Sequence, residues 1–180
     1  MSTMEPDGPE ALVEAVRERL VGALTLATGR REVAEELAQD ALVRAWQRWP
    51  EVRTADDPEA WVFRVGFNLA ASWGRRQSAE WRANRRSRAG SPTADAHLDA
   101  DAAGILALRS AVAALPARQR AVVVARYYLG YDVAGTAALL GIAPGTVKAT
   151  TSHAFAKLRV AGLLDDRTIS DRDEPEEVPR

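Results

Sequence analysis

Hydrophobic residues recur at intervals of three and four along most of the chain, which is the spacing that places them on one face of an α-helix. In the N-terminal part this pattern extends from Pro9 to about Arg76. Its clearest stretch contains Val33, Ala34, Leu37, Ala41, Leu42, Ala45, Trp46 and Trp49. We expect these side chains to line the inner face of one long helix, with Gly29 before it and Pro50 after it marking its limits.

A further helix is predicted to begin at the motif DDPEAW. Asp57 can accept a hydrogen bond from the free N–H groups of a first turn, and Pro58 suits the first helical position, where its missing N–H costs nothing. The helical spacing then continues to about Arg76. Residues 9–76 are therefore expected to form three helices joined by short connections.

The periodic pattern fails between residues 77 and 103, where Ser, Gly, Pro, Ala and charged residues dominate, as is typical of a flexible linker. Helical spacing returns at about residues 105–114, 117–129, 133–140 and 144–160. Residues 165–180 are acidic and poor in large apolar side chains, which predicts disorder. The chain is thus predicted to be all-α, with two small helical domains, 9–76 and 104–164, joined by the flexible linker 77–103.

The last two predicted helices are separated by Gly-Ile-Ala at residues 141–143, and Gly141 permits a sharp reversal between them. This arrangement predicts a helix-turn-helix. The expected inner face of the final helix consists of Val147, Thr151, Ala154 and Leu158. The spacing leaves small, polar or cationic residues facing outward, as a helix entering the DNA major groove requires: Lys148, Ala149, Thr150, Ser152, His153 and Lys157.

The net charge of −1 conceals an uneven distribution along the chain. Residues 104–164 carry seven Lys and Arg against one Asp, whereas residues 165–180 carry three basic residues against seven acidic ones. A small basic unit attracts the phosphates of nucleic acid. A solvated surface gives the same composition, so charge alone does not decide between the two interpretations.

The sequence contains no candidate catalytic or metal site. Cysteine is absent, and the two histidines, His97 and His153, lie in different parts of the chain. No group of His, Asp and Glu has the spacing of metal ligands, so neither a metal nor a cofactor is predicted. No segment approaches the roughly 18 consecutive apolar residues of a membrane span, and the N-terminus lacks the features of a signal peptide. We expect a soluble cytoplasmic protein without a membrane partner.

Three motifs resemble bacterial sigma factors of the extracytoplasmic-function group. The segments LPARQRAVVVARYYLG (115–130) and GTVK (145–148) are similar to the fourth conserved region of that family. The segment AEELAQDALVRAW (34–46) resembles its second region, and WVFRVGFNLA (61–70) resembles the helix that follows. The resemblance implies a sigma factor that binds core RNA polymerase and directs it to promoter DNA, with an anti-sigma factor as a further candidate partner.

The resemblance also implies three groups of contact residues. The polymerase-binding group consists of Glu35, Glu36, Gln39, Asp40 and Arg44. The group for the minus-ten promoter element consists of Arg53, Thr54, Ala55, Asp56, Trp61, Arg64, Asn68, Arg75 and Arg76. The group for the minus-thirty-five element consists of Thr146, Lys148, Ala149, Thr150, Ser152, His153 and Lys157.

The chemistry of these groups suits the implied partners. Polar residues of both signs on the second helix can pair with a mixed-charge surface. Aromatic residues mixed with cations, such as Phe63, Phe67 and Arg64, suit single-stranded DNA, because exposed bases stack while cations hold phosphates. Some of these aromatic side chains must also belong to the core, and Trp61 is expected to pack inward.

Several positions depart from the family pattern. Gly135-Thr136-Ala137 replaces the usual Glu-Ile-Ala, which predicts a locally weak helix, and Ala143 replaces the usual capping serine. Thr150 and His153 replace arginines, so we expect the final helix to make weaker contacts with guanines and phosphates, and promoter choice to depend mainly on the minus-ten element.

Two other functions remain open. The chain could be a helix-turn-helix regulator that acts as a dimer, although no dimerisation or sensor domain is recognised. It could also be a sigma-like scaffold that binds polymerase or an anti-sigma factor without reading promoters. An enzyme is the weakest of the alternatives, because no catalytic constellation is found.

Overall fold

The computed structural model of this protein describes residues 8–85 and 102–160. The regular elements in these two ranges are all helical. In chain order they are α1 (Pro9–Thr28), α2 (Arg31–Gln47), α3 (Trp49–Val52), α4 (Pro58–Arg85), α5 (Ala102–Ala114), α6 (Ala117–Val123), the π-helical η1 (Val124–Tyr128), α7 (Val133–Leu140) and α8 (Pro144–Val160). The prediction of an all-α chain is confirmed.

The ends of the N-terminal helices follow from local chemistry. α1 ends at Gly29, which adopts the left-handed conformation at φ +75° and donates its N–H to the carbonyl oxygen of Thr25. α4 begins where the sequence predicts. Asp57 Oδ1 accepts a hydrogen bond from the N–H of Ala60 at 2.8 Å, which satisfies a donor that has no partner within the helix.

Two helix limits differ from the predicted ones. Pro50 does not end the second long helix, because α2 already stops at Gln47 and Pro50 lies in the first turn of α3, where its missing N–H is harmless. α4 continues beyond Arg76 to Arg85, through a stretch without Gly or Pro. The predicted linker 77–103 therefore begins within α4 and ends within α5. Its remaining part, 86–101, and the acidic tail 165–180 lie outside the described residues.

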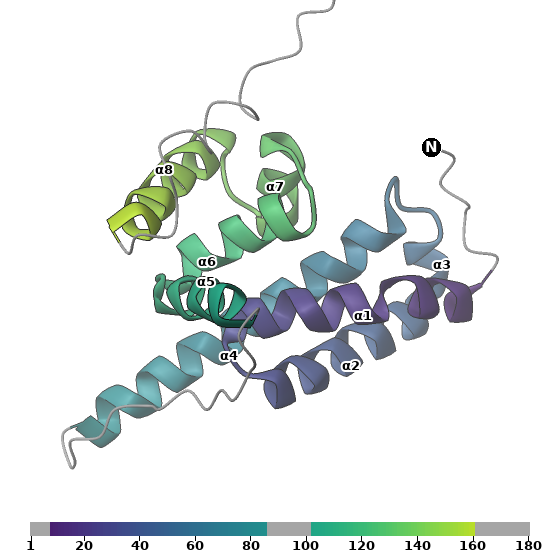
Figure 1. The fold of residues 1–180 in the computed structure, drawn as a ribbon. Helices are drawn as coiled ribbons and strands as arrows, with labels where there is room; N and C mark the ends of the chain where they lie inside the picture. The colour runs from purple at the N-terminus through teal and green to yellow at the C-terminus, as the bar shows by residue number, and fades with distance from the viewer. Residues whose placement is uncertain (1–7, 86–101, 161–180) are drawn as a thin grey trace, which may run out of the picture.

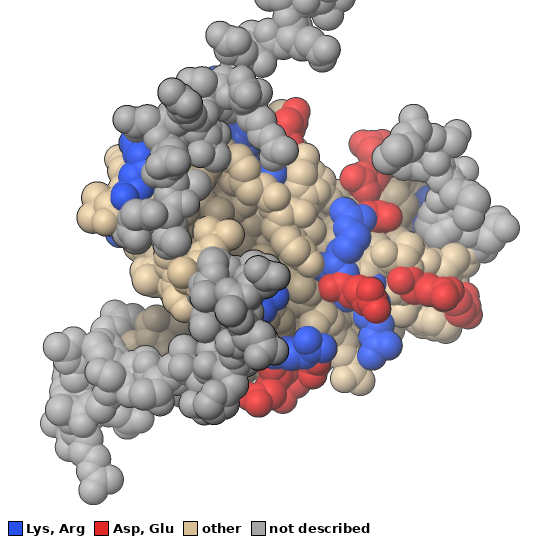
Figure 2. Space-filling model, in the orientation of Figure 1, with Lys and Arg blue, Asp and Glu red and all other residues tan. Residues whose placement is uncertain are grey.

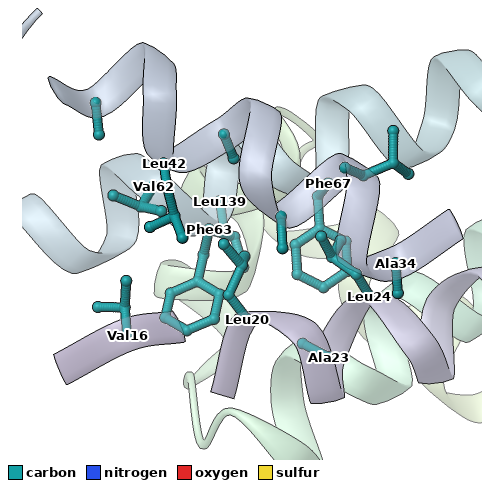
Figure 3. Close-up of a cluster of buried hydrophobic side chains, with 14 of the residues drawn as sticks. Val16, Leu20, Ala23, Leu24, Ala34, Leu42, Val62, Phe63, Phe67 and Leu139 are labelled. Atoms are coloured by element: carbon teal, nitrogen blue, oxygen red, sulfur yellow. The ribbon is translucent and has the colours of Figure 1, made fainter. Parts of the chain in front are cut away.

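Helices α1, α2 and α4 pack around the main hydrophobic core (Figure 3). Phe63 of α4 is its largest fully buried side chain and lies with Leu20 of α1, while Val62 lies near Leu42 of α2. Because the three helices bury one apolar face each, the opposite faces of α2 and α4 remain exposed for contacts with other molecules.

The C-terminal helices form a second unit with two smaller clusters of their own. One cluster joins Val122 of α6, Ala137 of α7 and Val147 of α8. The other contains Leu115, Val123, Ala154 and Leu158. Next to it the rings of Tyr127 and Phe155 lie 4.9 Å apart between centroids, a distance typical of favourable aromatic pairs. These contacts fix α8 against α6 and α7.

The two units pack against each other rather than standing apart. Figure 1 shows α5 and α6 lying along α1, with α7 beyond them, and α1 contacts both α5 and α6 while α4 contacts α7. Val124 and Ala125 of η1 and Leu139 of α7 belong to the same buried cluster as the side chains of α1, α2 and α4. A single core therefore extends across both units.

The segment predicted as one helix over residues 117–129 contains a change of helix type. The N–H of Leu129 donates to the carbonyl oxygen of Val124 at 3.0 Å, five residues earlier, as in a π-helix. Val124 and Ala125, the first residues of this turn, are buried in the main core, and η1 contacts α1.

Candidate nucleic-acid interface

The helix-turn-helix predicted from the sequence is present, and its first helix is better supported than expected. Asp132 precedes α7, and its Oδ1 accepts a hydrogen bond from the N–H of Gly135 at 2.6 Å. Such a cap contributes about 1 kcal/mol, which offsets the weakness expected from a glycine in the first turn. Gly141 ends α7 at φ +64° and donates its N–H to Ala137, as the predicted turn requires.

The inner face of α8 is wider than the sequence predicts. Val147, Thr151, Ala154 and Leu158 are buried, as expected. Thr150, expected to face outward, is also buried, with only 9% of its surface exposed. It lies three residues after Val147 and four before Ala154, which places it on the flank of the same face, and α6 and α7 both pack against α8. Thr150 is therefore not available to read DNA in this arrangement.

The rest of the predicted reading surface is exposed. Lys148, Ala149, Ser152, His153 and Lys157 all face solvent, and Thr146 is half-buried at the start of α8. Two of these residues are cationic, and α8 has no acidic residue. The exposed face of α8 is small, polar and basic, which suits the width of a DNA major groove.

Arg120, a basic residue of α6, has a structural role. It is half-buried in α6, and its guanidinium donates a hydrogen bond of 2.6 Å to the carbonyl oxygen of Ala113. Burial lowers the pKa of Arg120 from its usual value. The side chain thus ties the end of α5 to α6.

The predicted minus-ten residues of α4 lie on one unbroken helix. Trp61, Arg64, Asn68 and Arg75 follow each other at intervals of three, four and seven residues, so they share one face. Arg64, Asn68, Arg75 and Arg76 are exposed, and Trp61 is half-buried. The side chain of Arg75 donates a hydrogen bond to that of Ser72 at 2.8 Å. α4 therefore presents a row of polar and cationic side chains with one aromatic at its beginning.

Two aromatic residues do not take part in this row. Phe63 and Phe67 are buried in the main core, at 0% and 4% exposure, so they are not available to stack on bases. Trp73 is half-buried and packs against the same core. Of the four aromatic residues at positions 61, 63, 67 and 73, Trp61 and Trp73 retain exposed surface.

The loop before α4 completes the predicted minus-ten surface. Arg53, Thr54 and Asp56 are exposed, and Ala55 is half-buried. The hydroxyl of Thr54 donates to the carbonyl oxygen of Glu51 at 3.0 Å, which holds the loop close to α3. The loop directly precedes α4 in the chain, and both carry exposed residues of the predicted minus-ten group.

The predicted polymerase-binding residues, Glu35, Glu36, Gln39, Asp40 and Arg44, are all exposed on α2. Trp46, expected in the core, is instead 50% exposed, and Val43 is 47% exposed. Trp46 lies eleven residues after Glu35 and seven after Gln39, about three and two helical turns, so the three share a face. The exposure of Trp46 could have been predicted from its position in the sequence. It falls outside the narrow stripe of buried residues on α2 that includes Ala45.

Trp46 borders a shallow hollow of about 440 Å³ on the outside of α1 and α2. Its other lining residues come from α1 and are Glu10, Val13, Glu14, Arg17 and Glu18. Figure 2 shows acidic side chains, with basic ones between them, gathered over the α1 part of the face drawn. Exposed tryptophan is a residue type enriched at surfaces that contact another protein.

Within the described residues no cluster of His, Asp and Glu could hold a metal ion, and none of the helices there has the length and apolar character needed to span a bilayer.

Comparisons with known proteins match both helical units. Residues 12–80 match the family model Sigma-70 region 2, and residues 105–158 match Sigma-70, region 4. The chain is 38% identical to the ECF RNA polymerase sigma factor SigL of Mycobacterium tuberculosis over 138 residues, covering 74% of this chain and 76% of the relative. It is 35% identical over 147 residues to the RNA polymerase sigma-E factor of Streptomyces coelicolor, covering 79% and 80%.

Two solved structures share the fold. The sigma factor RpoE of Bartonella quintana, solved in complex with the anti-sigma factor NepR, aligns with a TM-score of 0.70 at 24% identity, covering 87% of this chain and 97% of that one. CnrH, solved in complex with the cytosolic domain of CnrY, aligns with a TM-score of 0.57 at 22% identity, covering 86% and 88%.

Proposed function

The chain belongs to the extracytoplasmic-function group of the sigma-70 family, and we propose that its two helical units divide the work of a sigma factor between them. As a member of this family it directs promoter recognition by RNA polymerase. We assign residues 9–76 to core polymerase and the minus-ten element, and residues 104–164 to the minus-thirty-five element. The observation that carries this assignment is the match of the region 2 and region 4 models, in that order, to the two units.

Polymerase binding is assigned to the exposed face of α2. Gln39 and Asp40 supply polar contacts, and Trp46 with Val43 adds the apolar surface that usually dominates the energy of an interface. Replacing Trp46 by Ala should weaken polymerase binding roughly tenfold or more, and the double change Gln39→Ala with Asp40→Ala should also weaken it. Gln77→Ala is the matched control, because Gln77 is also exposed but lies on α4. Unchanged affinity of the Trp46 and Gln39/Asp40 variants in a titration would remove this face from the interface.

Strand opening is assigned to the row on α4 and the loop before it. A base that leaves the stack can be held by shape and hydrogen bonds alone, without a nucleophile or metal. Asn68 is exposed in the middle of the row, with Arg64 one turn before it. Asn68→Ala should reduce the permanganate reactivity of the promoter more than it reduces polymerase binding. Equal loss of both would assign Asn68 to polymerase instead.

Duplex binding is assigned to the exposed face of α8. Lys148 and Lys157 are exposed near its two ends, and each phosphate contact should contribute about −0.9 to the slope of log affinity against log salt. Lys148→Ala should therefore weaken binding to matched and mismatched upstream sequences by a similar factor. Loss confined to one sequence would make Lys148 a reader of bases.

The burial of Thr150 weakens the argument for the alternative function, a scaffold that binds polymerase without reading promoters. Of the two positions where arginines are replaced, His153 alone is exposed, so the loss of direct contacts is smaller than the sequence implies. Run-off transcription with reconstituted holoenzyme tests the proposed function directly. Transcripts should require both core polymerase and this chain. Polymerase binding without transcription from any mapped promoter would favour the scaffold.

We also propose an anti-sigma partner and a cytoplasmic location. Both solved neighbours are described as complexes, one with an anti-sigma factor and one with the cytosolic domain of another protein. A sigma factor acts where RNA polymerase is found, which is the cytoplasm. Affinity capture of the tagged chain from its own cells, with Trp46→Ala as the variant that should lose polymerase, tests both statements.

A further inference from the structure

The exposed face of α8 carries positive charge that its own unit does not balance. Lys148, Lys157 and Arg159 are exposed, and α8 has no acidic residue. Asp132, the single acidic residue among positions 104–164, is engaged in capping α7. Neither lysine has an acidic partner among the described residues. The positive charge of this face is therefore available to an anionic partner.

Cationic side chains stand at both ends of a strip of small residues on α8. Lys148, Ser152, Ala156 and Arg159 follow one another at intervals of four, four and three residues, which places them on one side of the helix. All four are exposed, and we call them the cationic strip. The main contacts of α8 are with α6 and α7, and Figure 1 shows α8 on the outer side of the second unit. An anionic chain can therefore approach the strip closely.

An acidic segment follows α8 in the chain. Residues 165–180 carry seven Asp and Glu against three Arg, and four of these acids stand in the stretch DEPEE at positions 173–177. Concentrated charge of one sign is typical of interaction tails. Carboxylates pair with Lys and Arg through the same charge-assisted hydrogen bonds that phosphates form. The segment thus offers α8 the recognition chemistry that the DNA backbone offers.

The length of chain after α8 fits the length of the strip. Lys148 precedes Val160 by twelve residues, which is about 18 Å at the helical rise of 1.5 Å per residue. Asp173 follows Val160 by thirteen residues, and the coil that the composition of this stretch predicts has a mean span of about 20–25 Å. An attached partner reaches its highest effective concentration, about 1 mM, when its mean span matches the distance to its site. The DEPEE stretch therefore has the reach needed to meet Lys148.

We propose that the cationic strip of α8 is a docking site for the acidic segment 165–180 of the same chain, which competes with duplex DNA for this face. The proposal rests on the proposed assignment of α8 to duplex DNA. A weak contact is sufficient, because an intrinsic dissociation constant of about 0.2 mM against an effective concentration of about 1 mM lowers the apparent affinity for DNA about sixfold. Free duplex is then bound weakly, whereas a promoter already held beside α8 by polymerase displaces the segment.

Two variants of equal net charge test the competition. One neutralises the acidic stretch through Asp173→Asn, Glu174→Gln, Glu176→Gln and Glu177→Gln. The matched control neutralises four exposed carboxylates of the first unit through Glu10→Gln, Glu14→Gln, Glu18→Gln and Glu36→Gln. The first variant should bind a short DNA duplex about three- to tenfold more tightly than the wild type at low salt, with a steeper salt slope, and the control should stay within about twofold. Equal tightening of both variants would show that net charge alone acts, which would overturn the proposal.

A spin label detects the docked segment directly. Because the chain contains no cysteine, Val178→Cys gives one attachment site for a nitroxide. The nitroxide should broaden the amide signals of Lys148 and Ser152 in the nuclear magnetic resonance spectrum and leave those of Gln39 and Arg44 on α2 unchanged. Adding the duplex, raising the salt concentration or neutralising the DEPEE stretch should restore the signals of α8. The neutralised variant is the essential control, because its segment has the same length and reach.

The outcomes separate the docking proposal from the assignment of α8 to DNA. Signals of α8 that the nitroxide leaves sharp, or broadens equally in the neutralised variant, would overturn docking while duplex binding by the wild type upheld the DNA assignment. Broadening that the duplex does not relieve, although the duplex binds, would place the segment away from the DNA contacts and would also overturn the proposal. Failure of both the wild type and the neutralised variant to bind any duplex would overturn the DNA assignment, and the proposed competition with it.

Discussion

Two buried threonines in different surroundings provide a quantitative test of the structure. Thr136 of α7 is fully buried, and its hydroxyl has no hydrogen-bond partner among the described residues. Thr28 of α1 is also buried, but its hydroxyl donates to the carbonyl oxygen of Leu24 at 2.8 Å and accepts from the N–H of Arg30 at 3.2 Å. The same substitution at these two positions should therefore have opposite effects.

Thr136→Val should stabilise the protein. A hydroxyl buried without a partner costs about 1–3 kcal/mol, and valine replaces it with a methyl group of the same shape and the same β-branching. Allowing for some crowding by the methyl group, we expect a gain of about 1 kcal/mol, or roughly 2–4 °C in melting temperature for a chain of this length. Thr28→Val should cost about 1 kcal/mol, because it also leaves the N–H of Arg30 without its acceptor.

Urea denaturation followed by circular dichroism measures both variants. The midpoint should rise for Thr136→Val and fall for Thr28→Val, with unchanged slopes, so that the shifts report stability rather than a change in the denatured state. A fall in the midpoint of Thr136→Val would refute the reasoning, because it would show that the hydroxyl makes a favourable contact.

Substitutions at four other positions test individual features. Asp132→Ala should lower the free energy of unfolding, measured by urea denaturation, by about 1 kcal/mol, because the cap of α7 is lost. Asp132→Asn should retain most of the stability. Thr150→Arg should lower the melting temperature because the site is buried, whereas His153→Arg should leave it within about 1 °C and steepen the salt slope of duplex binding by about 0.9. Tyr131→Phe should remove the phenol that titrates near pH 12 in an ultraviolet titration. In the wild type, stability should fall as pH rises from 10 to 12, because only the unfolded state has lost this proton there, and the variant should lack that fall.

Much of the local structure was determined by the sequence itself. The bounds predicted for the last two helices, 133–140 and 144–160, are those observed, and the Asp57 cap begins α4 as predicted. The buried stripe of Val147, Thr151, Ala154 and Leu158 was also correct. These features depend on hydrogen bonds and spacings within a few residues, so they can be read without knowing what packs nearby.

The candidate sites were determined by the sequence only in outline. The exposed residues of α2, the polar row on α4 and most of the outer face of α8 lie where the helical period places them. The errors concern the flanks of helices. Thr150 is buried on α8, against which both α6 and α7 pack. On α2, Ala45 is buried but the next residue, Trp46, is exposed. The spacing of apolar residues in the sequence defines the centre of a helix's buried face, whereas the width of that face depends on the neighbouring helices.

The relation between the two units was decided by the tertiary structure alone. The sequence predicts two domains with a break between them, and nothing local indicates that Leu139 belongs to the core of the other unit. The approach of Tyr128 to Gly22 joins residues more than a hundred positions apart, through a π-helical turn that the hydrophobic spacing does not reveal. Contacts at such separation are selected by the shapes of surfaces that exist only once the helices have formed, which is why neither periodicity nor composition could predict them.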